Sequence, residues 1–147
     1  MDRTTSSTSV FAAFVAALIM LSIPFAASAS DDEHRQEDIA KHRQIAQAHE
    51  IAARCLQSGG KSADCHSQLQ KACKGIAVGD HCGLRTRAGE YRDNSKHIAD
   101  HQTMAKAHTN AAICLEGSAP HSACEAALKK DCGGVGVGKY CGLRHGH

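Results

Sequence analysis

The strongest constraint on this sequence is an internal repeat with a fixed cysteine spacing. Shifted by 59 positions, residues 39–85 (the first copy) match residues 98–144 (the second copy) at 21 of 47 positions without a gap. Each copy contains the pattern C-x9-C-x7-C-x8-C, and both end in the tetrapeptide CGLR. A duplication of this kind indicates one structural unit written twice. The fold must therefore build two equivalent units with equivalent crosslinks.

The segment before the repeat predicts export. Residues 10–23, VFAAFVAALIMLSI, form an apolar run between Arg3 and the small-residue segment AASAS. This order is typical of a secretory signal peptide, and we expect residues 1–29 to be removed by cleavage after Ala29. The run is short for a bilayer span, so an uncleaved anchor is the less favoured alternative. The mature chain is expected in the periplasm or outside the cell, without membrane attachment.

The mature chain has little material for a large hydrophobic core. All three phenylalanines lie in residues 1–29, the chain has no tryptophan, and most of its remaining apolar residues are alanine. Such a core buries little apolar area per residue, and small domains of this kind usually need disulfides or a metal ion. Eight cysteines and eleven histidines supply the groups for both.

The residue pattern of each copy predicts a helical hairpin followed by a glycine-rich tail. Residues rich in Ala, Gln, Lys and Glu favour helix, and Gly and Pro interrupt it. The expected helices span residues 32–57, 62–74, 95–116 and 118–131. Ser62 is the expected N-cap of the second helix. Gly75 and Gly134 are expected just after the ends of the short helices.

The predicted fold is therefore all-α. We expect two tandem Cys-stapled α-hairpin repeats that form a small four-helix bundle in one compact domain. Residues 30–85 form the first repeat, residues 86–94 a linker, and residues 95–147 the second repeat.

The cysteines predict disulfides, because an exported protein meets an oxidising compartment. In each copy the first two cysteines flank the hairpin turn and the last two flank the tail. The expected pairs are Cys55–Cys65, Cys73–Cys82, Cys114–Cys124 and Cys132–Cys141. Four cysteines allow three pairings, and one that joins Cys55 to Cys73 ranks second. The competing interpretation is thiolate ligation of a soft metal ion by these same cysteines.

Histidines recur on the predicted apolar face of both long helices. With a 3,4,3,4 spacing, the stripes contain His42, Ile45, His49, Ala52 and Leu56 in one helix and His101, Met104, His108, Ala111 and Leu115 in the other. His34 and His97 extend the stripes, which a bundle buries. Each buried imidazole needs a partner, and one metal ion satisfies several. The predicted metal ligands are His42, His49, His97, His101, Met104 and His108.

Other histidines receive weaker assignments. The alternative for the stripe is a set of core histidines that are hydrogen-bonded to the protein. His66, His81 and His121 have no histidine counterpart in the other copy, so we expect them at the surface. His145 and His147 follow the second CGLR, where we expect a flexible end that captures metal weakly or has no role.

These features predict an exported Cys/His-rich protein that buffers or sequesters a soft transition metal. Copper is the first choice, and zinc, silver and cadmium are the other candidates. The alternative function is a disulfide-stapled helical interaction module without metal. We expect no enzymatic activity and no catalytic residues, since no serine lies in a nucleophile elbow. A net charge of +2 without a basic stripe argues against nucleic-acid binding, and no protein partner is predicted.

Overall fold

Four α-helices make up the regular structure that the computed structural model describes, which covers residues 26–85 and 94–145. They are α1 (Ala26–Gln57), α2 (Ser62–Ala72), α3 (Asn94–Glu116) and α4 (His121–Asp131). The prediction of an all-α fold with two helices per copy is confirmed. Residues 1–25 of the predicted signal peptide and residues 86–93 of the predicted linker lie outside the described residues, so both assignments stay predictions.

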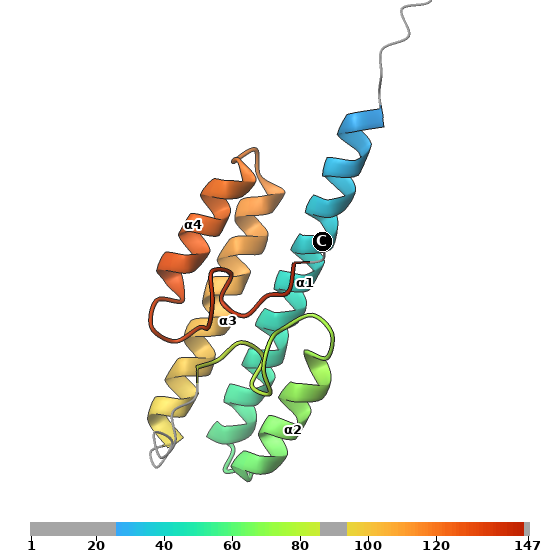
Figure 1. Ribbon diagram of the computed structural model, residues 1–147. Helices are drawn as coiled ribbons and strands as arrows, with labels where there is room; N and C mark the ends of the chain where they lie inside the picture. The colour runs from blue at the N-terminus through green and yellow to red at the C-terminus, as the bar shows by residue number, and fades with distance from the viewer. Residues whose placement is uncertain (1–25, 86–93, 146–147) are drawn as a thin grey trace, which may run out of the picture.

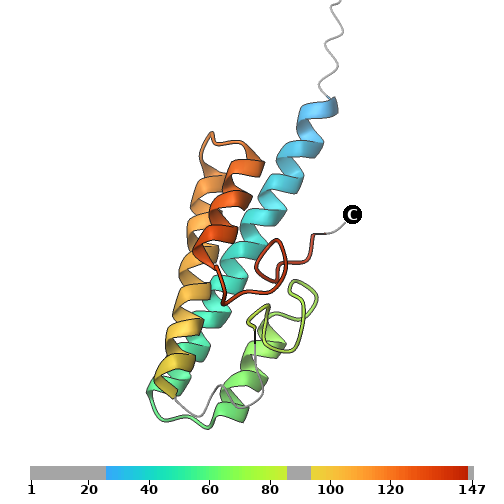
Figure 2. The same ribbon diagram turned by 60° about the vertical axis from the view of Figure 1, so that its left-hand side comes forward.

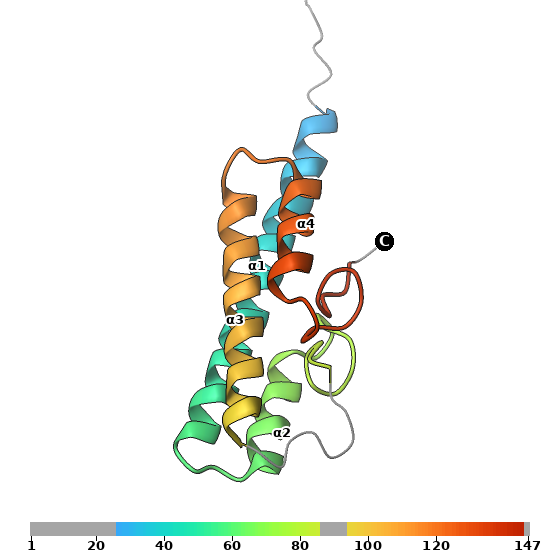
Figure 3. The same cartoon turned by 90° about the vertical axis from the view of Figure 1, so that its left-hand side faces the viewer.

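The helices are arranged in two layers. The long helices α1 and α3 run antiparallel and form one layer (Figure 1). The short helix α2 packs on α1, and α4 packs on α3. Figure 3 shows α2 and α4 on the same side of the long helices, with the two glycine-rich tails between them. In the predicted bundle of four helices, the tails therefore lie between the two short helices.

The starts of α1 and α4 and the N-cap of α2 differ from the sequence prediction. Helix α1 begins at Ala26 and not at residue 32. Ser62 begins α2, but its predicted role as N-cap is wrong, because Lys61 is the N-cap and makes no side-chain capping hydrogen bond. Helix α4 begins at His121 and not at residue 118. Pro120 is its N-cap, with an extended backbone (φ −58°, ψ 141°). Proline disfavours helical geometry in the residue before it, which explains the later start.

The apolar stripes pack as predicted from their spacing. Ile45, Ala52 and Leu56 of α1 are buried, as are Ala111 and Leu115 of α3. Because many residues at this interface are alanines, the histidines among them fill much of the space between the long helices. His34, which the stripe pattern also included, is exposed. That part of the prediction is wrong, since the buried face of α1 begins about one turn later, at Asp38 and Ile39.

The disulfides have the pairing that the sequence analysis ranked first. Their Cα–Cα distances are between 5.6 and 6.2 Å, and the pairs are Cys55–Cys65, Cys73–Cys82, Cys114–Cys124 and Cys132–Cys141. All eight cysteines are therefore oxidised, which overturns the alternative of thiolate ligation in this state. Four disulfides are consistent with an oxidising compartment outside the cytoplasm.

None of the helices described over residues 26–85 and 94–145 is both long enough and apolar enough to cross a membrane.

The two tails cross each other on one side of the long helices, where Figure 2 shows them side by side. Val78 N–H donates to Gly142 O, and the equivalent Val137 N–H donates to Gly83 O, both at 2.8 Å. A Cβ atom on Gly83 would lie 2.5 Å from the Cα of Gly142. Only glycine permits this approach, so the crossing requires it in both copies.

The crossing also exchanges apolar side chains between the copies. Leu143 of the second copy packs in the cluster around Ile45 and Leu69. Leu84 of the first copy packs in the cluster around Met104 and Leu128. Each CGLR corner therefore completes the core of the other copy, which explains why the tetrapeptide occurs twice.

Candidate metal centre

The antiparallel packing of α1 and α3 pairs histidines between the two copies. His42 lies against His108 and His49 against His101, each pair with an Nδ1–Nδ1 distance of 2.8 Å. All four side chains are buried, with at most 4 % of their surface exposed. In the sequence, these histidines form a separate stripe along each long helix. The structure instead joins each histidine to one on the opposite helix.

A backbone carbonyl determines the proton positions in each pair. His49 Nε2 lies 3.0 Å from Cys82 O, and His108 Nε2 lies 3.2 Å from Cys141 O. Because a carbonyl oxygen only accepts, each of these histidines donates from Nε2, and its Nδ1 is the acceptor in the neutral ring. Its partner, His101 or His42, must then donate from Nδ1. The Nε2 atoms of His101 and His42 consequently carry free lone pairs.

The buried imidazoles are neutral at physiological pH. Burial, together with neighbouring imidazoles, lowers the pKa of His49 to about 3 and that of His101 to about 2. Burial likewise lowers the pKa of His42 to about 3 and that of His108 to about 4. The proton assignment for neutral rings therefore applies to both pairs.

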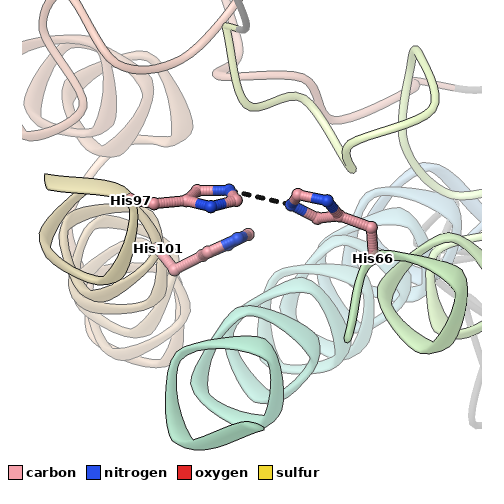
Figure 4. A group of neighbouring side chains, drawn as sticks. All are labelled: His66, His97 and His101. Atoms are coloured by element: carbon pink, nitrogen blue, oxygen red, sulfur yellow. Dashed lines mark hydrogen bonds between the residues drawn. The ribbon is translucent and has the colours of Figure 1, made fainter. Parts of the chain in front are cut away.

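A third pair of imidazoles lies next to His101, one of the two histidines whose Nε2 carries a free lone pair. His66 of α2 approaches His97 of α3 with an Nε2–Nε2 distance of 2.8 Å. Together with His101 they form the three-histidine cluster, in which one ligand atom from each residue lies within 4.8 Å of the others. Figure 4 shows the three rings converging from the two helices. His97 and His101 are fully buried, and His66 is half-buried at the edge.

The cluster has the dimensions of a metal site. Imidazole nitrogens bind zinc at about 2.0–2.1 Å, so two nitrogens of a tetrahedral site are about 3.3 Å apart. One pair in the cluster is closer than this, and no pair is farther apart than 4.8 Å. Small side-chain rotations suffice to bring the three nitrogens around one ion. The three-histidine cluster therefore fits a transition-metal ion.

A buried acceptor without a partner gives a second reason to expect an ion. The His101 Nε2 atom is inaccessible to solvent and has no hydrogen-bond partner among the described residues. A buried polar atom without a partner costs free energy, and a metal ion removes that cost. The chain from Cys82 O through His49 to His101 fixes the tautomer in which this Nε2 is free. Such supporting hydrogen bonds orient histidine ligands in known metal sites.

The other ligand atoms of the cluster also remain unprotonated. Burial, followed by the nearby His97 and His81, lowers the pKa of His66 to about 4. Burial and His81 also lower the pKa of His97. Metal ions bind neutral imidazole, so protons compete weakly at pH 7. The His81 ring lies edge-on to that of His66, with a centroid distance of 4.6 Å.

The predicted ligands separate into different roles. His97 and His101 belong to the cluster, whereas His49 and His108 use both ring nitrogens in hydrogen bonds to the protein. Met104 is fully buried and packs with apolar residues in the core of the second copy. These three residues support the site or the core, which differs from the ligand roles predicted for them.

One candidate ligand was missed because of how the copies were compared. His66 was expected at the surface, since no histidine occupies the equivalent position in the second copy, but it is half-buried against His97. The equivalent residue is Glu125, which is also a metal-ligating type. Comparison by ligand chemistry, and not by residue identity, would have identified this position.

The tail histidine is less free than predicted. The His145 ring packs against Tyr140 with a centroid distance of 3.9 Å, and its Nδ1 lies 3.6 Å from Asp38 Oδ2. Only 16 % of its side chain is exposed. The expected flexible capture group therefore does not describe His145, and His147 lies outside the described residues.

No protein-family model, curated protein or solved structure matches the chain. Its function is accordingly inferred from the chemistry of the site.

Proposed function

We propose that this protein is exported and binds one transition-metal ion at the three-histidine cluster, where it buffers or sequesters that ion. The observation that supports it most is the grouping of three imidazoles, His66, His97 and His101, the last of which has a buried Nε2 without a hydrogen-bond partner among the described residues. Export is supported by the predicted signal peptide and by four disulfides, which persist in oxidising compartments.

The donor set narrows the choice of metal. With all eight cysteines oxidised and Met104 in the core, the donors are imidazole nitrogens. Imidazole suits borderline ions, and Cu²⁺ binds most tightly among the divalent first-row metals. Copper therefore remains the first choice, in its divalent form, and zinc is the second. Silver and cadmium lose the thiolate support that the sequence analysis considered for them.

The proposed role is binding and not catalysis. The cluster consists of histidines alone, and it contains no carboxylate that could act as a general base. His97 and His101 are fully buried, so an ion reaches them past the half-buried His66. A site with one ligand at its edge can load and release an ion by movement of that one side chain, as a buffer requires.

A zinc titration in the presence of a competing chelator tests the proposal. The oxidised protein is compared with His66→Ala, which removes one ligand at the edge of the site, and with His34→Ala, which removes an exposed histidine of α1. We expect His66→Ala to bind one tight equivalent fewer than the wild type and His34→Ala to bind the same number. Loss of a direct ligand should weaken this site by more than the roughly 10–100-fold that loss of a supporting partner costs.

An unchanged stoichiometry in His66→Ala would remove the three-histidine cluster from consideration. Absence of tight binding by the wild type would instead favour the metal-free interaction module. Circular dichroism of each variant establishes that the helices are retained, and alanine at position 66 of α2 favours helix.

A further inference from the structure

The two copies of the repeat share only two positions that carry a charged side chain. Lys71 is identical to its equivalent Lys130, and Arg85 is identical to its equivalent Arg144. The other identical positions hold cysteine, glycine, histidine or aliphatic residues. All four charged side chains are exposed, so burial in the core does not explain why both copies keep them. Exposed charged residues that persist in this way are candidates for binding.

The crossing of the tails brings two of these residues to one cleft. Arg144 belongs to the second copy, but its main-chain N–H donates to Ile76 O at 2.9 Å and its Nε donates to Ala77 O at 3.0 Å. These bonds fix the guanidinium group against the first copy. Arg144 and Lys71 consequently line the same cleft, which has a volume of about 410 Å³.

The residues that line this cleft include three cations and no carboxylate. The cations are Lys71, Lys74 and Arg144, and none of them forms an ion pair among the described residues. The carboxylate of Asp80, next to the cleft in the sequence, instead accepts a hydrogen bond from Gln70 at 3.1 Å. Apart from Nε, the N–H groups of Arg144 make no hydrogen bond within the described part of the protein. The positive charge of the cleft is therefore not neutralised by the protein.

Two glycines that both copies share leave open space in the same cleft. Gly75 and Gly79 have positive φ angles of 88° and 72°, and no atom lies within 4 Å of the position that a Cβ would take. Over the described residues, neither N–H group donates to a backbone carbonyl. Backbone N–H groups beside residues in this left-handed conformation can form concavities that bind anions. Both glycines thus add donors to the three cations.

We propose that Lys71, Lys74 and Arg144, the basic cleft, bind a doubly charged oxyanion of the phosphate class, either free or as the phosphate group of a small organic ester. Arginine forms paired hydrogen bonds with phosphate oxygens, and lysine supplies point charges. Helix α2 ends at this cleft, and the negative end of its dipole opposes an anion. That partial charge is only about half a unit, so three full positive charges outweigh it. Anion binding here is a function beyond metal binding, because the basic cleft and the three-histidine cluster share no residue.

Titration of the oxidised, metal-free protein with sodium phosphate tests the basic cleft. The amide resonances of Gly75 and Gly79 are followed in a proton–nitrogen correlation spectrum, at slightly alkaline pH so that phosphate is doubly charged. We expect saturable shifts at both glycines, which sodium chloride at the same ionic strength does not produce. A parallel titration with methyl phosphate distinguishes the two sources of the group, since the tighter-binding compound identifies the ligand as the ester or the free ion.

Two lysine variants examine the role of the charges. Lys71→Gln and Lys74→Gly should each weaken phosphate binding by at least about fivefold, because each removes a charge-assisted hydrogen bond. The second copy has Gly133 in place of Lys74, so we expect the fold to accept glycine at this position. Lys106→Gln is the matched control, because Lys106 is an exposed lysine of α3 outside the cleft, and it should bind phosphate as the wild type does.

Equal shifts with chloride and phosphate would show only screening of surface charge and would overturn the inference. Unchanged phosphate binding in both lysine variants would also overturn it, since Lys71 would then act only on the dipole of α2. Circular dichroism establishes that each variant keeps its helices. The zinc titration of His66→Ala reports on the three-histidine cluster and the glycine amides report on the basic cleft, so failure of one proposal is distinguishable from failure of the other.

Discussion

Reduction of the four disulfides is expected to unfold the protein without denaturant. Each bridge closes a loop with a sequence separation of 9 or 10 residues. Removal of a bridge that closes a loop of that length lowers the free energy of unfolding by about 2.5–3 kcal/mol in the chain-entropy model. Four such losses total about 10 kcal/mol, which is comparable to the whole stability of a typical domain. The alanine-rich core has little apolar area with which to offset that loss.

Far-ultraviolet circular dichroism with and without a phosphine reductant measures this effect. We expect the helical signal to collapse on reduction and to return after reoxidation. Ala substitution of the Cys73–Cys82 pair alone should lower the free energy of unfolding by about 2–5 kcal/mol, because it frees one of the crossing tails. A reduced protein that keeps its helical signal and melts cooperatively would show that the core suffices without disulfides.

Acidification is expected to destabilise the protein steeply below about pH 6.5, the pKa of histidine in an unfolded chain. Burial lowers the pKa of His42 and His49 to about 3 and that of His101 to about 2 in the folded state. The unfolded state therefore binds protons that the folded state excludes, so the free energy of unfolding falls as the pH falls from about 6.5 toward those folded values.

The size of the acid effect follows from the same pKa difference. At pH 5 each buried histidine costs about 2 kcal/mol, so the set together costs several kcal/mol. Urea unfolding of the metal-free protein at pH 7, 6 and 5 measures it, in a range where most carboxylates remain ionised. His34→Ala, at an exposed position, should show the wild-type dependence. A stability that is the same at pH 7 and pH 5 would mean that these imidazoles are not buried as neutral groups.

Local features of the sequence were sufficient to predict much of the fold. The helical segments and the buried stripe are properties of short windows, and the chosen disulfides join cysteines that are only 9 or 10 residues apart. The late start of α4 and the cap at Lys61 are differences of a few residues in this otherwise local pattern.

The site depended on long-range geometry that no local pattern encodes. The pairing of His49 with His101 requires α1 and α3 to pack antiparallel in one register. The free Nε2 of His101 also depends on the backbone carbonyl of Cys82. This carbonyl lies in the tail of the first copy and accepts a hydrogen bond from His49. Spacing along one helix identified buried histidines correctly, but it did not indicate which nitrogens remain available.

The position of His66 shows a related limit. Its ring reaches His97 from a different helix, 31 residues away in the sequence, so no helical periodicity connects the two. Likewise, the contact of His145 with Asp38 joins the tail of the second copy to the start of the buried face of α1. Both contacts join segments far apart in the sequence, so the spacing of residues along one helix does not predict them.

The most direct test of the account is a nitrogen-15 spectrum of the histidine side chains before and after addition of one equivalent of Zn²⁺. We expect the Nε2 resonances of His66, His97 and His101 to shift together to values typical of metal-bound nitrogen. His49 and His108 should keep their Nε2 protons, which donate to Cys82 and Cys141. Zinc-dependent shifts at His49 and His108, with His66, His97 and His101 unchanged, would contradict the assignment of the metal to the three-histidine cluster.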